Sequence, residues 1–193
     1  GLVGAFSARP RAHAEAESGF LGALASVLSA ALQRIHSEER LAYLAQFDNL
    51  TGVPNRALMR DRFAQMLAQA SRHGAKLGVM FVDLDHFKAV NDMQGHAAGD
   101  DLLKEVARRL SACVRSGDTV ARISGDEFVV ILGDLASAAS AAGVAQKVLE
   151  RVAAPFSLGG RETFVSASIG IAIYPDDGEN VDALVSAADA AMY

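Results

Sequence analysis

The sequence predicts an α+β fold in which a central, mostly antiparallel sheet is flanked by helices and preceded by a linker helix. A long proline-free segment before residue 47 carries apolar residues at helical spacing. Beyond it, short apolar runs typical of strands are mixed with helical segments. Two of these runs are separated by only four residues, which fits a β-hairpin turn.

Residues 1–46 are expected to form a smaller N-terminal segment with a stalk helix, and residues 47–193 the main domain. No proline interrupts residues 15–46, and the apolar stripe there is spaced for one helix face. Its members are Phe20, Leu24, Leu28, Leu32 and Ile35. A core helix of the main domain is the alternative, but this stripe suits a partner helix.

The main domain is expected to mix helices and strands. The expected helices are 55–73, 100–114 and 136–153, with a last one from about 181, and the expected strands are 77–82, 119–123, 128–132 and 164–173. Residues 77–82 are uniformly apolar and too few for a buried helix, so they predict a central strand. Residues 164–173 alternate between apolar and small polar side chains, as a half-buried strand does.

Composition excludes several classes of protein. A length of 193 residues allows one domain and a smaller segment, and the net charge of −5 argues against a nucleic-acid polymer as partner. A single cysteine excludes a disulfide framework and a cysteine-rich zinc site. The longest uncharged hydrophobic run near the start has 14 residues, against about 20 for a bilayer span, so we expect a cytoplasmic chain without a membrane segment.

Acidic residues occupy two places where strands end. Asp83 follows a buried strand, and Asp126 and Glu127 stand at the tip of the expected hairpin. Mg²⁺ prefers one or two carboxylates together with substrate phosphates and water, so acids from neighbouring strands predict a cation site. The alternatives are a solvated hairpin tip and, for Asp85, a helix cap.

The segment Ser124-Gly125-Asp126-Glu127-Phe128 resembles the signature of the GGDEF family, the diguanylate cyclases. Further matches occur in the family's order along the chain, from about residue 47 to the end. They are residues 48–56, 83–88, 91–100, 168–172 and 187–193. The resemblance implies a fold like the palm of nucleotidyl cyclases and polymerases. It also implies condensation of two GTP molecules into cyclic di-GMP with release of two pyrophosphates.

The resemblance also implies roles for the acids. Asp83, the carbonyl of Leu84 and Asp126 would hold two Mg²⁺ or Mn²⁺ ions per active site, and Glu127 would assist at the metal or at the attacking 3′-hydroxyl. Such ions lower the pKa of the hydroxyl and neutralise charge on the phosphates. Catalysis would require two domains face to face, because each holds one GTP, so a homodimer is expected.

The resemblance further implies which residues bind the nucleotide. By the resemblance, amides around His86, Phe87 and Lys88 would cradle the β- and γ-phosphates. Asn91 and Asp100 would bind guanine, which offers a donor pair that adenine lacks. Taken alone, Asn91 would serve equally well in a turn, and Asp100 as a helix N-cap.

A regulatory site is expected next to the signature. Arg115 and Asp118 occupy the position of the family's RxxD inhibitory site, one strand before Ser124. Arginine binds phosphate and guanine acceptors in a fork, and aspartate accepts from guanine N–H groups. Without the family context this spacing would predict a surface ion pair worth under about 1 kcal/mol.

The sequence departs from the family pattern in two places. Ser124 replaces the first glycine of the signature, near the expected guanine pocket beside Gly125, and would be strained if that position needed a positive φ. The family pattern also continues beyond Tyr193 with a lysine and an arginine that engage the terminal phosphates. At the other end, residues 1–34 resemble the last strand and closing helix of a GAF sensory domain.

Three functions are compatible with these observations. The first is a product-inhibited diguanylate cyclase, which the intact Asp83, Asp126 and Glu127 favour. The second is a non-catalytic GGDEF-like receptor for cyclic di-GMP or GTP, which Ser124 would suit. The third, an adenylate-type cyclase on the same fold, would prefer ATP.

Overall fold

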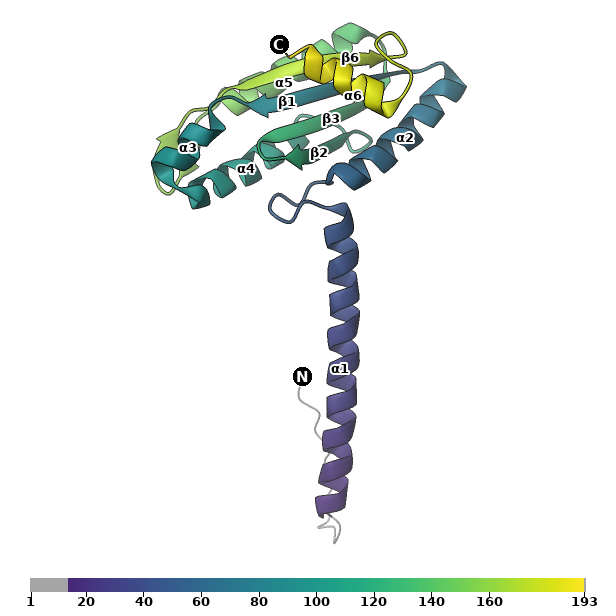
Figure 1. Cartoon of the computed structure of the whole chain (residues 1–193), viewed down its shortest axis with the longest axis vertical. Coiled ribbons are helices and arrows are strands. Elements are labelled where there is room, and N and C mark those ends of the chain that lie inside the picture. Colours follow the sequence, from purple (N-terminus) through teal and green to yellow (C-terminus); the bar gives the residue numbers. More distant parts are fainter. Residues whose placement is uncertain (1–13, 193) are drawn as a thin grey trace. The chain divides into compact units, whose positions relative to one another are not determined.

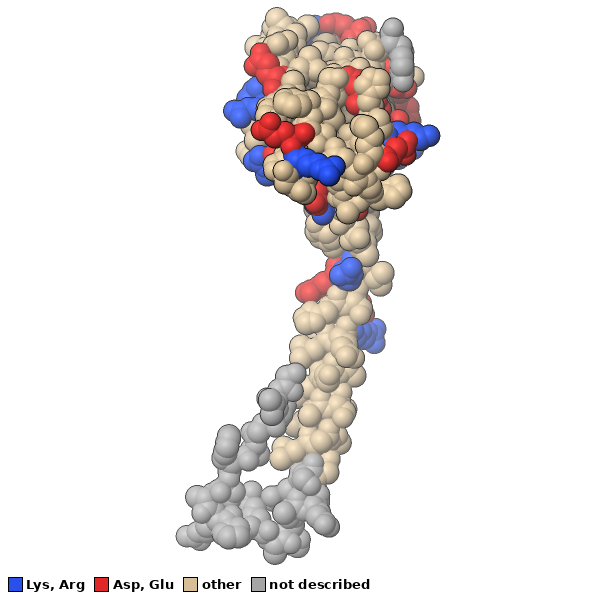
Figure 2. All heavy atoms as spheres, turned by 90° about the vertical axis from the view of Figure 1, so that its left-hand side faces the viewer, with Lys and Arg blue, Asp and Glu red and all other residues tan. Residues whose placement is uncertain are grey.

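The computed structural model describes residues 14–192 of the chain. Two compact units meet between Ala45 and Gln46. The helix α1 (Ala14–Gln46), which the sequence predicts, lies in the first unit except for its last residue. Most of its described large apolar side chains are exposed, including Phe20, Leu28 and Leu41. Figure 2 shows few charged side chains along the described part of this helix.

The expected GAF-like strand falls before residue 14 and lies outside the described residues. Within residues 14–192, none of the helices combines the length and hydropathy that a bilayer crossing needs.

The second unit is built on a four-stranded sheet in which every neighbouring pair of strands is antiparallel. The strands are β1 (Lys76–Leu84), β2 (Thr119–Ser124), β3 (Glu127–Leu135) and β6 (Ala167–Tyr174). Their order is β2-β3-β1-β6. The predicted α+β class is confirmed, and the apolar run in β1 is a central strand because both of its edges are paired.

Helices cover both faces of the sheet (Figure 1). On one face, α2 (Arg56–His73) and α6 (Val181–Ala190) pack on the side chains of Val79 and Phe81. On the other, α4 (His96–Ser111) and α5 (Ala138–Ala153) pack on Met80 and Val82. The alternation of β1 side chains between two cores explains why the strand is apolar without interruption.

Several boundaries differ from the sequence-based expectation. The helix expected at 100–114 begins at His96, because Gly95 has a φ of 86° and starts it. The strand expected at 164–173 begins only at Ala167. Three short elements were not expected: α3 (Phe87–Gln94), β4 (Phe156–Leu158) and β5 (Arg161–Thr163). Strands of three residues carry too little periodicity to be recognised.

Gly170 fixes the distance between β6 and α6. A Cβ atom at this position would lie 1.8 Å from the carbonyl oxygen of Ala188 and 2.7 Å from the amide nitrogen of Met192. Both atoms belong to the backbone, so a side chain at Gly170 would force the C-terminal end of α6 away from the sheet. This close approach brings Asp189 near the end of the sheet that carries the predicted acids.

Candidate active site

The register of the sheet brings the predicted acids to one place. Asp83 near the end of β1 lies opposite Glu127 on β3 and opposite Ser168 on β6. Directly paired residues on neighbouring strands present their side chains to the same face of a sheet, with Cβ atoms about 5 Å apart. Asp126 occupies the turn just before Glu127, and its carboxylate has no hydrogen-bonding partner among residues 14–192.

Negative charge accumulates around Asp83. Burial raises the pKa of this carboxyl above its ordinary value, and the carboxylates of Asp126, Glu127, Asp85 and Asp189 raise it further. Oxygen donors with an excess of negative charge are the ligands that Mg²⁺ and Mn²⁺ prefer. No three His, Cys, Asp or Glu side chains in the described part of the chain form a metal-binding group. The expected set of two carboxylates and one carbonyl does not require one, and the donors fit a divalent cation.

The hairpin accommodates Ser124 without strain. Ser124 is the last residue of β2, in extended backbone, whereas the positive φ of the turn, 43°, falls on Gly125. The Ser124 hydroxyl donates a hydrogen bond to the carboxylate of Glu127. The residue that replaces the family's glycine therefore orients one of the predicted catalytic acids.

Arg122 anchors the turn of the hairpin, a role that the sequence did not reveal. Its Nε donates to the carbonyl of Gly125 at 2.8 Å, and its Nη1 to Oδ1 of Asp48 at 3.0 Å. Burial favours a raised pKa for Asp48, but hydrogen bonds from Thr51 and Arg122 outweigh it and hold the pKa below its ordinary value. Asp48 is thus an ionised partner that fixes the guanidinium against the hairpin.

The loop after β1 has the geometry of an anion site. His86 adopts a left-handed conformation with a φ of 61°, and no side chain caps the N-terminus of α3 that follows it. A left-handed residue followed by a helical one turns successive N–H groups toward one side. The Phe87 side chain packs on the core while the Lys88 side chain is exposed. Asp85 does not cap this helix, contrary to the alternative considered for it.

Asn91 of α3 lies against Gly99 of α4, the residue that precedes Asp100. The Asn91 side chain lies over Gly99, since a Cβ atom there would come within 2.0 Å of the Asn91 Oδ1. Asn91 is inside α3 and Asp100 inside α4, so the alternatives of a turn residue and a helix N-cap are wrong. Gly99 supplies the space for the amide, a contact that no local sequence pattern predicts.

Arg115 and Asp118 lie in one turn but do not form a tight ion pair. The Nε atom of the Arg115 guanidinium lies 3.8 Å from Oδ2 of Asp118, and the Arg115 side chain is exposed. The Asp118 carboxylate instead accepts the backbone N–H groups of Arg115 at 2.9 Å and Gly133 at 3.0 Å. Beside this turn is a cavity of about 260 Å³, which also contacts residues that the sequence did not single out. They are Arg62, Gln65, Met66 and Gln69 of α2.

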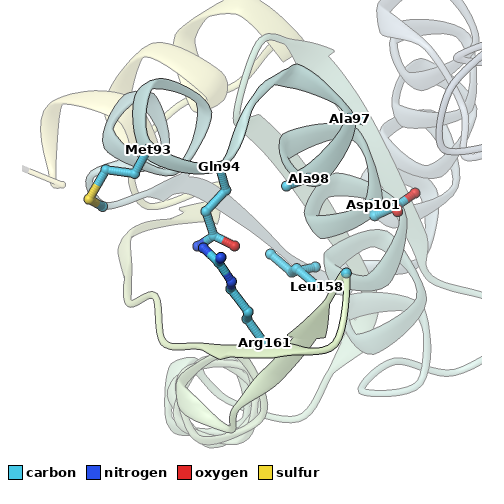
Figure 3. A pocket seen from close by; sticks show the side chains of 8 residues that line it. Met93, Gln94, Ala97, Ala98, Asp101, Leu158 and Arg161 are labelled. Carbon is cyan, nitrogen blue, oxygen red and sulfur yellow. The ribbon is translucent and has the colours of Figure 1, made fainter.

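A separate cavity of about 440 Å³ lies between the α3–α4 pair and the β4–β5 hairpin (Figure 3). Gln94 and Arg161 point toward one another across it, and Leu158 lies beside them. None of the predicted site residues lines this cavity. Gln94 also donates to the Thr163 hydroxyl at 3.0 Å, which joins α3 to the hairpin.

Comparison with known proteins specifies the family to which this fold and its acidic strand-end site belong. Residues 45–193 match the family described as diguanylate cyclase, GGDEF domain. The chain belongs to this family.

Among characterised relatives, the bifunctional diguanylate cyclase/cyclic di-GMP phosphodiesterase MucR of Pseudomonas aeruginosa is 49% identical over 173 residues. That match covers 90% of this chain but 25% of MucR. The diguanylate cyclase TpbB of the same organism is 44% identical over 154 residues, with 79% of this chain and 35% of TpbB covered. The chain thus spans a quarter to a third of these relatives.

Solved structures agree with the family assignment. The GGDEF domain of TpbB superimposes with a TM-score of 0.74 at 43% identity, covering 76% of this chain and 86% of that one. The coiled coil and GGDEF domain of DgcB from Caulobacter crescentus, in complex with c-di-GMP, gives a TM-score of 0.74 at 25% identity. That match covers 90% of this chain and 92% of DgcB.

We expect Gly99→Ala to weaken guanine-nucleotide binding while leaving the fold intact. The new methyl group overlaps the end of the Asn91 side chain, which can swing away, so the loss is that of one hydrogen bond, about three- to tenfold in Kd. Calorimetric titration with GTP measures it. Gly143→Ala, with no atoms near its Cβ, is the control. Unchanged affinity in Gly99→Ala would show that Asn91 does not contact the base.

Asp83→Asn should stabilise the domain at neutral pH in the presence of a chelator. The raised pKa of Asp83 means that the folded state disfavours the ionised carboxyl relative to the unfolded state. The cost is therefore complete above the folded-state pKa and disappears below the ordinary value of 3.8. Thermal denaturation from pH 3 to pH 8 would show a gain that fades in acid. Glu162→Gln, on exposed β5, should show no gain. Equal Tm values for wild type and Asp83→Asn at pH 7 would contradict the claim that burial and neighbouring carboxylates destabilise the ionised Asp83.

Proposed function

We propose that this chain is a metal-dependent diguanylate cyclase that condenses two GTP molecules into cyclic di-GMP and two pyrophosphates. The observation that carries the proposal is the convergence of Asp83 with Asp126 and Glu127 across the β1–β3 register. Membership of the GGDEF family and the 44% sequence identity to the diguanylate cyclase TpbB support it. Because the substrate would be GTP, we expect the reaction to take place in the cytoplasm.

Asp83, the Leu84 carbonyl and Asp126 would hold two Mg²⁺ or Mn²⁺ ions. When bound, such ions activate the 3′-hydroxyl and neutralise charge on the phosphates. Glu127, opposite Asp83 and oriented by Ser124, is placed to accept the proton of that hydroxyl or to support the cation site. Asp126 is free of hydrogen bonds in the described structure, so its oxygens are available.

Backbone amides and side chains of α3 and α4 would bind the nucleotide. The amides of His86, Phe87 and Lys88 at the uncapped start of α3 would receive the β- and γ-phosphates, and the Lys88 ammonium adds positive charge. Asn91 and Asp100 would donate to and accept from guanine, and Ser124 and Gly125 would flank the base from the hairpin. Adenine lacks the donor pair of guanine, so its binding would leave polar groups of this pocket without hydrogen bonds and would disfavour ATP.

The active form would be a homodimer. One domain presents one set of acids and one guanine site, whereas the product contains two nucleotides. The exposed apolar side chains of α1 offer a face for the same helix of a second copy. DgcB, which aligns over 90% of this chain, is described as a coiled coil with a GGDEF domain.

Cyclic di-GMP would inhibit the enzyme by binding at Arg115 and Asp118. The exposed Arg115 is free to turn to a ligand, and Arg62 also lines the cavity beside Asp118. Arginine and aspartate side chains suit the phosphates and guanine edges of a cyclic dinucleotide. The structure of DgcB in complex with c-di-GMP shows that a relative binds this molecule.

The expected outcome of incubation with GTP and Mg²⁺ is cyclic di-GMP, resolved from substrate by chromatography. Asp126→Asn should lower the rate at least about a hundredfold, because it removes a charged oxygen from the cation site. Glu162→Gln should retain the wild-type rate. Nucleotide binding without any cyclic product, at a concentration where the protein is dimeric, would favour the non-catalytic receptor. Faster turnover of ATP would favour an adenylate-type cyclase.

Arg115→Ala should raise the inhibition constant of cyclic di-GMP by about tenfold or more while the initial rate stays the same. Arg115 is a cleaner test than Asp118, whose carboxylate holds backbone N–H groups. Initial rates measured over a series of cyclic di-GMP concentrations give the constant. Arg161→Ala, an exposed arginine of β5, is the matched control. Wild-type inhibition in Arg115→Ala would refute the site.

A further inference from the structure

Asp85 links the end of β1 to β6 through both of its carboxylate oxygens. Oδ2 accepts the Ser166 hydroxyl at 2.5 Å, and Oδ1 accepts the Ser168 hydroxyl at 2.8 Å. The backbone N–H of Asp85 also donates to the Ser166 carbonyl at 3.0 Å. The β1–β6 ladder, which pairs Leu84 with Ala167, is therefore extended by one residue. We call Asp85, Ser166 and Ser168 the strand-end clamp.

The clamp lies between the two parts of the proposed site. Asp85 directly follows Leu84, whose carbonyl belongs to the cation set, and directly precedes His86, which begins the phosphate loop. His86 has a φ of 61°, and L residues keep this conformation only where their surroundings hold it. Three hydrogen bonds to the preceding residue provide such a hold.

The hydroxyl of Ser168 donates to the carboxylate of Asp85 and not to that of Asp83. Ser168 lies opposite Asp83 in the register, yet it donates to Asp85. Both oxygens of Asp85 thereby accept a hydroxyl from the β6 side. Two hydroxyl donors stabilise the Asp85 carboxylate in this position, because they replace hydrogen bonds that it would otherwise make with water.

We infer that the strand-end clamp is a positioning device which sets the backbone amides of His86, Phe87 and Lys88 for the triphosphate of GTP. Asp85, Ser166 and Ser168 act through the loop and do not touch the reacting atoms. The inference rests on the proposed function, since it assigns these amides to the phosphates.

The test compares Ser166→Ala, Ser166→Thr and Ser166→Asp with wild type in steady-state kinetics with GTP. Loss of the hydroxyl should raise KM about three- to tenfold and leave kcat within about twofold. Threonine keeps the hydroxyl and should restore KM. Aspartate would face Asp85 with a like charge, so its KM should exceed that of the alanine variant. Ser157→Ala, an exposed hydroxyl on β4, should match wild type.

A second measurement does not depend on turnover. Hydrogen exchange of the Asp85 amide, which donates to the Ser166 carbonyl, should be faster without nucleotide in Ser166→Ala/Ser168→Ala than in wild type, whereas exchange in the centre of β1 should be unchanged. Unchanged exchange at Asp85 would overturn the inference. So would a lower kcat with wild-type KM, which would mean that the clamp acts on the acids. If wild type neither binds nor converts GTP, the proposed function fails, and the exchange result alone shows whether the clamp holds the loop.

Discussion

The pairing of β1 with both β3 and β6 is the constraint on which the rest of the structure depends. Apolar side chains of β1 are buried on both faces of the sheet, so a shift of one residue would exchange the two cores. The same register carries Asp83 opposite Glu127 and Ser168. Like charges close together are unfavourable, and only a well-packed core can hold them there. The core thus supplies the free energy that keeps the acids in place.

Several supports of the site come from residues that carry out no chemistry. Gly99 leaves room for the Asn91 amide, and Gly170 lets α6 approach the sheet. Arg122 fixes the hairpin backbone through the carbonyl of Gly125, with Asp48 as its ionised partner. These residues determine where the functional groups lie, so the geometry of the site is a property of the whole unit.

The sequence alone predicts the fold class, the central strand and the hairpin, because continuous or alternating apolar runs report directly on burial. The acids at the strand ends are predicted for the same reason. The start of α4 was misplaced because it depends on the backbone of Gly95, and the short strands β4 and β5 lack a periodic pattern. The partners of Asp85 lie about eighty residues away. Contacts of this kind depend on tertiary packing and leave no local signal.

The 33-residue helix α1 has a consequence for how the protein responds to dilution. A helix with most of its described large apolar side chains in water gains little from tertiary packing, which is the main source of helical stability in proteins. Pairing with another copy would supply that packing, so by mass action the helical content of this segment and the state of assembly become a single equilibrium. Circular dichroism and sedimentation would then report the same transition.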